Sequence, residues 1–158
     1  MNLFIELHQN LIKMLLDAKV DFIIIGGYSV IFHGYKRTTG DIDIWLKPNN
    51  DNKKKLLIVL QQFGFEEDDL ARVDTLNFTE HNVFSIGEQP EKIDFLTHIS
   101  MVKYEDADKQ KIEAEMDGLI IPFLHLNHLV LSKINTGRPK DKADVDMLQL
   151  IEKQKNQL

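Results

Sequence analysis

The sequence Ile23-Ile24-Ile25-Gly26-Gly27-Tyr28-Ser29 is followed, after a polar connection, by Asp41-Ile42-Asp43-Ile44. The first segment predicts an apolar strand that runs into a Gly-Gly turn and then a short helix. The second alternates carboxylates with isoleucines, a period of two that is typical of a strand. Asp41 and Asp43 are therefore expected on one face of that strand, roughly 7 Å apart, where their charges repel each other. A divalent cation would remove this repulsion.

The composition indicates one globular domain with its own hydrophobic core. The chain has 158 residues and no cysteine, a length that buries a core without disulfides. The lack of cysteine excludes thiolate catalysis, iron–sulfur clusters and cysteine-ligated zinc. We expect a single domain over residues 1–158, with a core at about 20–123 and a helical extension at about 124–158.

Charge and hydropathy bear on location and partners. The formal net charge of −6 argues against a surface that binds nucleic acid everywhere, although it allows a local basic patch. Such a patch is offered by Lys133, Arg138, Lys140 and Lys142. No apolar run approaches the roughly 20 residues that span a bilayer, and the N-terminus lacks the features of a signal peptide. We therefore expect a cytoplasmic protein with no membrane partner.

The periodicity of the remaining chain predicts an α+β (mixed α/β) fold, a small mixed sheet flanked by helices. Strands are expected at 20–25, 41–46, 73–79, 83–86 and 91–96, with a hairpin at 114–123 that turns at Asp117-Gly118. Helices are expected at 2–19, 28–32, 52–62, 126–134 and 140–155. Asp51 is expected to cap the third of these helices. The acidic run 66–69 is expected in a solvated loop, and 98–111 in a loop with at most one helical turn.

A third carboxylate, Asp94, lies between apolar residues of the strand at 91–96. Two-metal phosphoryl transfer needs acidic oxygens on one rigid wall, and glycines after a buried strand allow backbone amides to approach a phosphate. Each part alone has a plainer explanation. Asp41 could cap a loop, Asp43 and Asp94 could form surface ion pairs, and Gly26-Gly27 could be a tight turn. Their combination on consecutive strands favours a site.

These residues resemble the signature of nucleotidyltransferases with a DNA polymerase beta-like fold. Ile25-Gly26-Gly27 and Asp41-Ile42-Asp43-Ile44 match it, with the gap between them at the long end, and Ile93-Asp94-Phe95 offers the later carboxylate. The run 26–41 is similar to that of bacterial minimal nucleotidyltransferases, a group that includes toxins of toxin–antitoxin pairs. Their C-terminal pattern resembles Lys133, Gly137-Arg138-Pro139-Lys140-Asp141 and Asp144.

The resemblance implies a polymerase beta palm-like fold and a magnesium-dependent enzyme that moves a nucleoside monophosphate from an NTP to an acceptor hydroxyl. Two Mg²⁺ ions, with Mn²⁺ as an alternative, would be held by Asp41, Asp43 and Asp94, and Asp94 would also orient or deprotonate the acceptor. The implied nucleotide-binding residues are Gly26, Gly27, Ser29, Arg37 and Lys133. Arg37 as an ordinary surface arginine, and Lys133 as a helix lysine extended to solvent, remain open alternatives.

Other readings of the chain also stay open. The fold could be kept without chemistry, as a nucleotide-binding module or a module for a partner protein such as an antitoxin. The acids could instead be surface features of an interaction protein. If the protein is an enzyme, the same three carboxylates would serve a small molecule, an RNA end or a protein hydroxyl as acceptor. Trp45 could stack on a base at the rim of the site, and His33 could either cap a helix or touch ligand.

Overall fold

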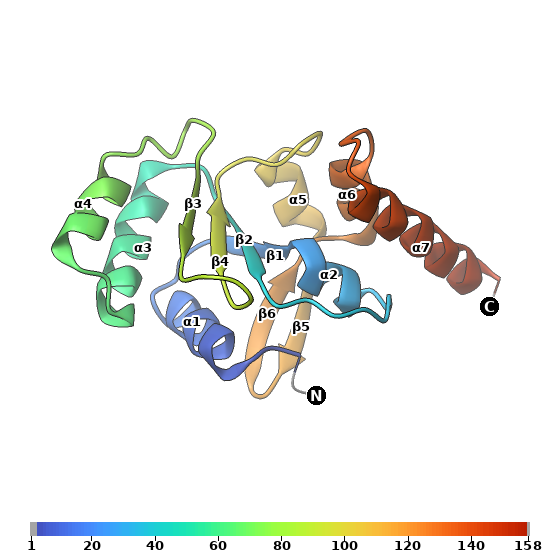
Figure 1. Cartoon of the computed structure of the whole chain (residues 1–158), viewed down its shortest axis with the longest axis horizontal. Coiled ribbons are helices and arrows are strands. Elements are labelled where there is room, and N and C mark those ends of the chain that lie inside the picture. Colours follow the sequence, from blue (N-terminus) through green and yellow to red (C-terminus); the bar gives the residue numbers. More distant parts are fainter. Residues whose placement is uncertain (1–2, 158) are drawn as a thin grey trace.

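The computed structural model describes residues 3–157, which form a mixed sheet of six strands between two layers of helices (Figure 1). Across the sheet the strand order is β3-β4-β2-β1-β6-β5. The strands are β1 (Phe22–Ile25), β2 (Ile42–Leu46), β3 (Val83–Ile86), β4 (Ile93–Leu96), β5 (Ile112–Met116) and β6 (Leu119–Phe123). The helices are α1 (Glu6–Asp17), α2 (Gly26–Phe32), α3 (Asn50–Phe63), α4 (Glu67–Asp74), α5 (Tyr104–Gln110), α6 (Leu126–Lys133) and α7 (Pro139–Asn156). This architecture confirms the predicted fold class.

The larger hydrophobic core lies on the face of the sheet that α1, α3 and α4 cover (Figure 1). Alternation along the strands sends Ile24, Ile42, Ile44 and Phe95 to this face, where all four are fully buried. They pack with the apolar stripes of the helices, for example with Leu56 of α3. Burial of each such side chain contributes about 1.5–3 kcal/mol, so this face fixes the register of the strands.

The opposite face packs against α5, α6 and α7 and carries the site. Ile23 of β1 and Trp45 of β2 lie here in one cluster with Leu129 and Leu148 of the C-terminal helices. Trp45 is 1% exposed and its ring lies edge-on to Tyr104, 5.1 Å between centroids and 80° between planes. Trp45 is therefore a core residue, and of the positions open to it from the sequence, the rim of the site is not the one it occupies.

The stretch after α3 differs from the prediction. The acidic run opens α4, and residues 75–79 form turns, so the predicted strand at 73–79 is wrong. Acidic side chains in a first turn stabilise a helix N-terminus, and Val73 is buried against the core while the acids stay in water. Leu70 and Val73 have a helical spacing of three, but the surrounding charged residues made the segment resemble a loop in the sequence.

Smaller differences concern helix ends. Asn49 caps α3, because its side chain accepts a hydrogen bond from the backbone N–H of Asn52 at 2.8 Å, whereas Asp51 lies inside the first turn. The loop expected at 98–111 contains α5. The hairpin turn at Asp117-Gly118 is confirmed, with φ of 51° and 81°, as a type I′ turn requires. The first residue of the helix predicted at 2–19 lies outside the described residues.

Candidate active site

The register of the strands brings two of the predicted carboxylates side by side. Asp43 of β2 is the direct partner of Asp94 in the parallel strand β4. On either side, Ile25 of β1 pairs with Asp43 and Ser85 of β3 pairs with Asp94. Paired residues share a face of the sheet. Ile25, Asp43, Asp94 and Ser85 therefore form one row across four strands, and we call Asp43 and Asp94 the carboxylate pair.

The electrostatics of the carboxylate pair disfavour two negative charges. Burial raises the pKa of Asp43 to about 6, the charge and hydrogen bonding of Asp94 add to this rise, and the charge of Lys133 opposes it. Asp94 accepts a hydrogen bond from the Ser85 hydroxyl, and the Lys92 ammonium lies 3.5 Å from its carboxylate. Two half-buried carboxylates in this arrangement are suited to a divalent cation, which would offset their mutual repulsion.

The third predicted carboxylate lies one residue before β2 and points to a different partner. Asp41 accepts a hydrogen bond from the backbone N–H of Lys92 at 3.0 Å. It lines an adjoining hollow of about 600 Å³ together with Gly27, Asp43 and Asp94. Among residues 3–157, no three acidic, histidine or cysteine side chains are close enough to hold a metal. The carboxylate pair is therefore the part of the predicted triad that the fold brings into contact.

The two glycines let the backbone of α2 approach the carboxylates and the cations closely. Gly26 has φ of 68°, and a Cβ at this position would overlap the Asp43 carboxylate. A Cβ at Gly27 would lie 2.5 Å from the Thr39 hydroxyl and 3.0 Å from Nη2 of Arg37. A side chain at Gly26 would therefore be strained by its φ and by Asp43, and one at Gly27 would displace Thr39 and Arg37. We call the backbone of Gly26-Gly27 the glycine cradle.

Ser29 is the predicted nucleotide-binding residue that the fold removes from the cavity. Its side chain is fully buried in α2, and its hydroxyl has no hydrogen-bond partner among the described residues. Gly26, Gly27, Arg37 and Lys133 all line the main cavity with the carboxylate pair.

Arg37 and Lys133 face the glycine cradle and are held there by two aspartates of α7. The Arg37 guanidinium contacts both carboxylate oxygens of Asp144, at 3.1 and 3.2 Å. The Lys133 ammonium lies 3.1 Å from Asp144 and 3.2 Å from Asp141. Both cationic side chains are largely buried, 13% and 11% exposed, so neither extends into solvent as the alternatives supposed. We call Arg37, Lys133, Asp141 and Asp144 the cation network.

Asp141 is stabilised in its charged form despite its burial. Burial alone would raise its pKa, but the hydrogen bond from Thr136 and the charge of Lys133 outweigh this, and its pKa is lowered. Arg138 adds a contact of 2.7 Å from Nε. Asp141 and Asp144 were part of the C-terminal resemblance but received no role from the sequence. Their spacing of three places them on one face of α7, and this spacing could have indicated from the sequence that they act together.

The main cavity has a volume of about 710 Å³ and two unlike ends. The glycine cradle, Arg37 and Lys133 form one end, and the carboxylate pair lies between the ends. The other end is lined by Val83, Leu96, His98, Ile99 and Met101. Sequence reasoning missed this second end, because its residues carry no motif.

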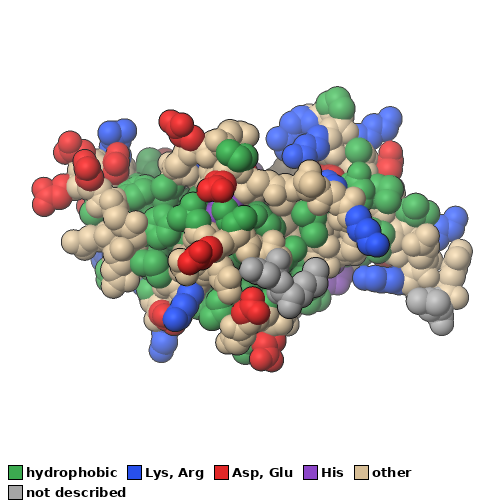
Figure 2. Space-filling model, turned by 60° about the horizontal axis from the view of Figure 1, so that its bottom comes forward, with side chains coloured by type: hydrophobic (Ala, Val, Ile, Leu, Met, Phe, Trp, Pro, Cys, Tyr) green, Lys and Arg blue, Asp and Glu red, His purple; other side chains and the backbone are tan. Residues whose placement is uncertain are grey.

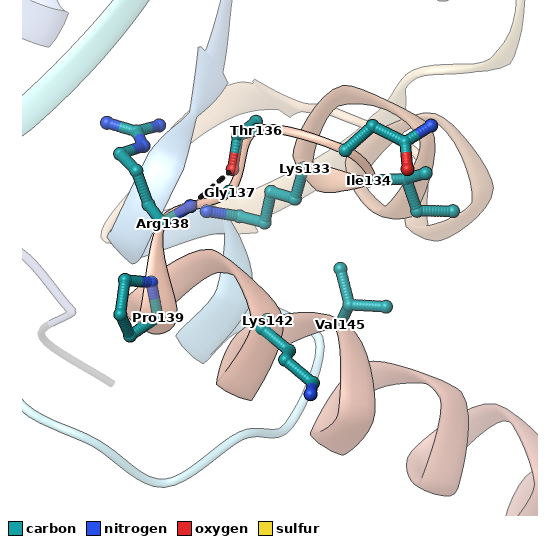
Figure 3. A pocket seen from close by; sticks show the side chains of 9 residues that line it. Lys133, Ile134, Thr136, Gly137, Arg138, Pro139, Lys142 and Val145 are labelled. Carbon is teal, nitrogen blue, oxygen red and sulfur yellow. Dashed lines mark hydrogen bonds between the residues drawn. The ribbon is translucent and has the colours of Figure 1, made fainter.

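A separate hollow of about 470 Å³ opens at the connection between α6 and α7 (Figure 3). It shares Lys133, Thr136 and Arg138 with the main cavity, and Figure 3 shows the Lys133 side chain reaching toward the turn that the Thr136–Arg138 hydrogen bond closes. Ile134, Pro139 and Val145 give it an apolar lining.

Charged side chains are unevenly spread over the surface. Figure 2 shows acidic side chains gathered at the end formed by α4, and lysine and arginine side chains toward α6 and α7. Arg37, Lys133, Arg138 and Lys140 line one end of the main cavity, although the net charge of the chain is negative. An anionic ligand is favoured at this end.

His33 and His125 serve as helix caps. His33 ends α2 and its Nε2 lies 2.6 Å from the carbonyl of Leu124, and burial lowers its pKa. His125 caps α6 by accepting a hydrogen bond from the backbone N–H of Asn127. Of the two roles considered for His33, the structure shows the cap.

Paired carboxylates beside a glycine cradle on a mixed sheet are the features of a nucleotidyltransferase. The chain belongs to the family described as "Nucleotidyltransferase of unknown function (DUF6036)", whose model matches residues 2–156. This confirms the class that the sequence resembled, and the protein is a transferase.

Two solved structures share the fold. The lincomycin-bound lincosamide antibiotic adenylyltransferase LnuA matches with a TM-score of 0.57 and 14% identity over 94% of this chain and 98% of LnuA. TM1012 from Thermotoga maritima, provisionally described as a nucleotidyltransferase, matches with a TM-score of 0.59 and 18% identity over 92% of this chain and 91% of TM1012. A search of curated proteins found no significant match. Within residues 3–157, no helix combines the length and hydropathy needed to cross a bilayer.

Proposed function

We propose that the protein moves a nucleoside monophosphate from an NTP to an acceptor hydroxyl with Mg²⁺ as its metal. The observation that carries the proposal is the carboxylate pair, which faces the glycine cradle within one cavity. When bound, Mg²⁺ would be held by Asp43 and Asp94 with Asp41 nearby, and would neutralise charge on the reacting phosphates. The raised pKa of Asp43 supports this fit, because the metal-free pair repels a second negative charge.

The glycine cradle and the cation network would bind the triphosphate. Backbone amides without side chains can lie against phosphate oxygens. Arg37 and Lys133, fixed by Asp144, would neutralise the negative charge that grows on the leaving pyrophosphate. Because these cations are already oriented by buried carboxylates, little ordering remains to be done when the nucleotide binds.

Asp94 is placed to act on the acceptor. It lies on the β3 side of the pair, away from the glycine cradle, and is 17% exposed to the cavity. Its hydrogen bond with Ser85 and its contact with Lys92 fix its orientation. We assign to it the acceptance of the proton from the attacking hydroxyl.

The test is incubation of the purified protein with Mg²⁺, α-labelled ATP and cell extract, with pyrophosphate release measured in parallel. ATP comes first because LnuA is an adenylyltransferase. Wild type is expected to label an acceptor, and the Asp43→Asn/Asp94→Asn double variant to lose transfer. Asp146→Asn, an exposed change on α7, is the matched control.

Two outcomes would count against the proposal. Undiminished transfer by the double variant would remove the carboxylate pair from the mechanism. Metal-dependent binding of every NTP tested, with no pyrophosphate release in extract, would favour the nucleotide-binding module that the sequence left open. Asp41 points to the backbone of Lys92 rather than to the carboxylate pair, and this is the observation that favours such a module.

A further inference from the structure

The end of the cavity opposite the glycine cradle received no role in the proposed binding of the triphosphate, and its lining is more apolar. Val83 of β3 pairs with Leu96 of β4 one step beyond Ser85 and Asp94 on the same face of the sheet. Met101 follows in the loop after β4. Val83 and Met101 are 67% and 71% exposed although they line a cavity. We call Val83, Leu96, His98, Ile99 and Met101 the apolar wall.

The apolar wall includes one aromatic ring, that of His98, which is backed by the ring of His81. The rings of His81 and His98 are stacked, 3.5 Å between centroids and 7° between planes, and His98 lines the cavity. Burial and the neighbouring His81 lower the pKa of His98, so the ring is neutral near pH 7. A neutral aromatic face beside exposed apolar side chains is suited to a ring or an apolar surface of a ligand.

The order of groups across the sheet decides which substrate meets this wall. In a displacement at phosphorus, the entering and leaving oxygens lie roughly in line on opposite sides. The glycine cradle and the cation network lie on the β1 side of the carboxylate pair, and the apolar wall lies on the β4–β3 side. Pyrophosphate leaving toward the cradle therefore requires the acceptor to enter from the apolar wall.

We propose that the apolar wall binds the acceptor, and that the acceptor is an uncharged or cationic small molecule that carries its hydroxyl beside a ring or an apolar face. This inference rests on the proposed function. The hydroxyl oxygen forms a bond to the α-phosphorus and its proton passes to Asp94. The bond between the α-phosphorus and the bridging oxygen breaks, and pyrophosphate leaves with that electron pair.

The distribution of charge argues against an RNA acceptor. An RNA strand would need several lysine or arginine contacts to successive phosphates. In the described part of the chain, the β3–β4 side of the cavity contributes one cation, Lys92, and its ammonium lies beside Asp94. The cations of the opposite end are Arg37, Lys133, Arg138 and Lys140, and three of them contact Asp141 or Asp144. In the proposed function, the triphosphate occupies this end and takes up its positive charge, so these cations would not be available to RNA phosphates.

The experiment separates the acceptor by class. Cell extract is divided into small-molecule filtrate, total RNA and protein, and each fraction is incubated with the enzyme, Mg²⁺ and each α-labelled ribonucleoside triphosphate in turn. Label is expected in the filtrate. Label confined to RNA or protein would overturn this inference while upholding nucleotidyl transfer. No label in any fraction would overturn both.

Variants then test the wall itself. Val83→Lys and His98→Ala should raise the amount of filtrate needed for half-maximal rate by about tenfold or more, since a charge or a lost face opposes an apolar ligand. The dissociation constant for ATP, measured by calorimetry, should not change. Ile120→Lys is the matched control, because Ile120 is 57% exposed on β6 and lies outside the cavity. If Val83→Lys and Ile120→Lys need the same amount of filtrate for half-maximal transfer of the label, the apolar wall does not bind the acceptor.

Discussion

Asp43→Asn is expected to stabilise the metal-free protein while it abolishes transfer. The pKa of Asp43 is raised from 3.8 to about 6 by burial and by Asp94, so the folded state holds the charged carboxylate less well than the unfolded chain does. A difference of about 2 pH units corresponds to about 3 kcal/mol, at 1.36 kcal/mol for each unit. Asparagine is nearly isosteric and removes this penalty, because the charge that Asp94 repels is gone.

The penalty has a defined pH window. A carboxylate whose folded pKa is raised destabilises the fold fully above about pH 6, and the effect fades as pH falls from 6 to 3.8. At pH 8 without divalent metal, the melting temperature of Asp43→Asn should exceed that of wild type by about 6–12 °C, at 2–4 °C per kcal/mol for a chain of this size. The gain should shrink toward pH 4.

The assay is thermal unfolding followed by circular dichroism, with EDTA and then with excess MgCl₂. Mg²⁺ is expected to raise the melting temperature of wild type and to leave that of Asp43→Asn nearly unchanged, because binding to the folded state stabilises it. Asp146→Asn, on the exposed side of α7, controls for the loss of one negative charge. A variant no more stable than wild type at pH 8 in EDTA, or equal stabilisation of both proteins by Mg²⁺, would refute the reasoning.

The other predictions concern the glycine cradle, the cation network and a helix cap. Gly26→Ala should lose NTP affinity and destabilise the fold by more than Gly87→Ala, since both glycines have positive φ but the space around Gly87 is open; urea unfolding and ATP titration compare them. Asp144→Asn should cost about 3–5 kcal/mol because Arg37 loses its ion-pair partner and Lys133 loses one of its two, against about 0.5 kcal/mol or less for Asp146→Asn. As pH drops below 6.5, His8 and His33 should each subtract at most about 1.4 kcal/mol of stability per pH unit, a loss opposite in sign to the effect of Asp43. His33→Gln should lessen this loss, because burial lowers the pKa of His33 in the fold and favours its neutral form.

Each of these has a contrary result. Equal losses in the two glycine variants would show that the approach of the Asp43 carboxylate imposes no constraint beyond φ. Equal stability of the two aspartate variants would make the ion pairs of Asp144 incidental. An unchanged acid response in His33→Gln would place the titrating group elsewhere.

Much of the fold was readable from local pattern. The apolar runs before Gly26 and around Ile42, the turn at Asp117-Gly118 and the two C-terminal helices all lie close to where the sequence predicts them. Periodicity and turn chemistry carry that information within a few residues. The prediction from periodicity was wrong at α4, where four consecutive acidic residues favoured a loop, although the segment is a helix with Val73 buried in the core.

Trp45 shows a second kind of failure. Its parity correctly placed it on the face of the sheet that carries Asp43, since both lie on β2 at alternate positions. Parity does not report what covers that face farther along the strand, and α5 covers Trp45 with Tyr104. Whether a residue on the active face is site or core is decided by a helix distant in sequence.

The sequence by itself indicated the class of protein, a nucleotidyltransferase, because Gly26-Gly27 and the alternating aspartates that carry the resemblance are local features of the chain. The tertiary structure alone decided which groups meet. Strand pairing joined Asp43 to Asp94, α7 placed Asp144 against Arg37 and Lys133, and the β3–β4 edge set an apolar wall opposite the glycine cradle. These contacts depend on register and helix packing between segments far apart in the chain, which no local pattern encodes.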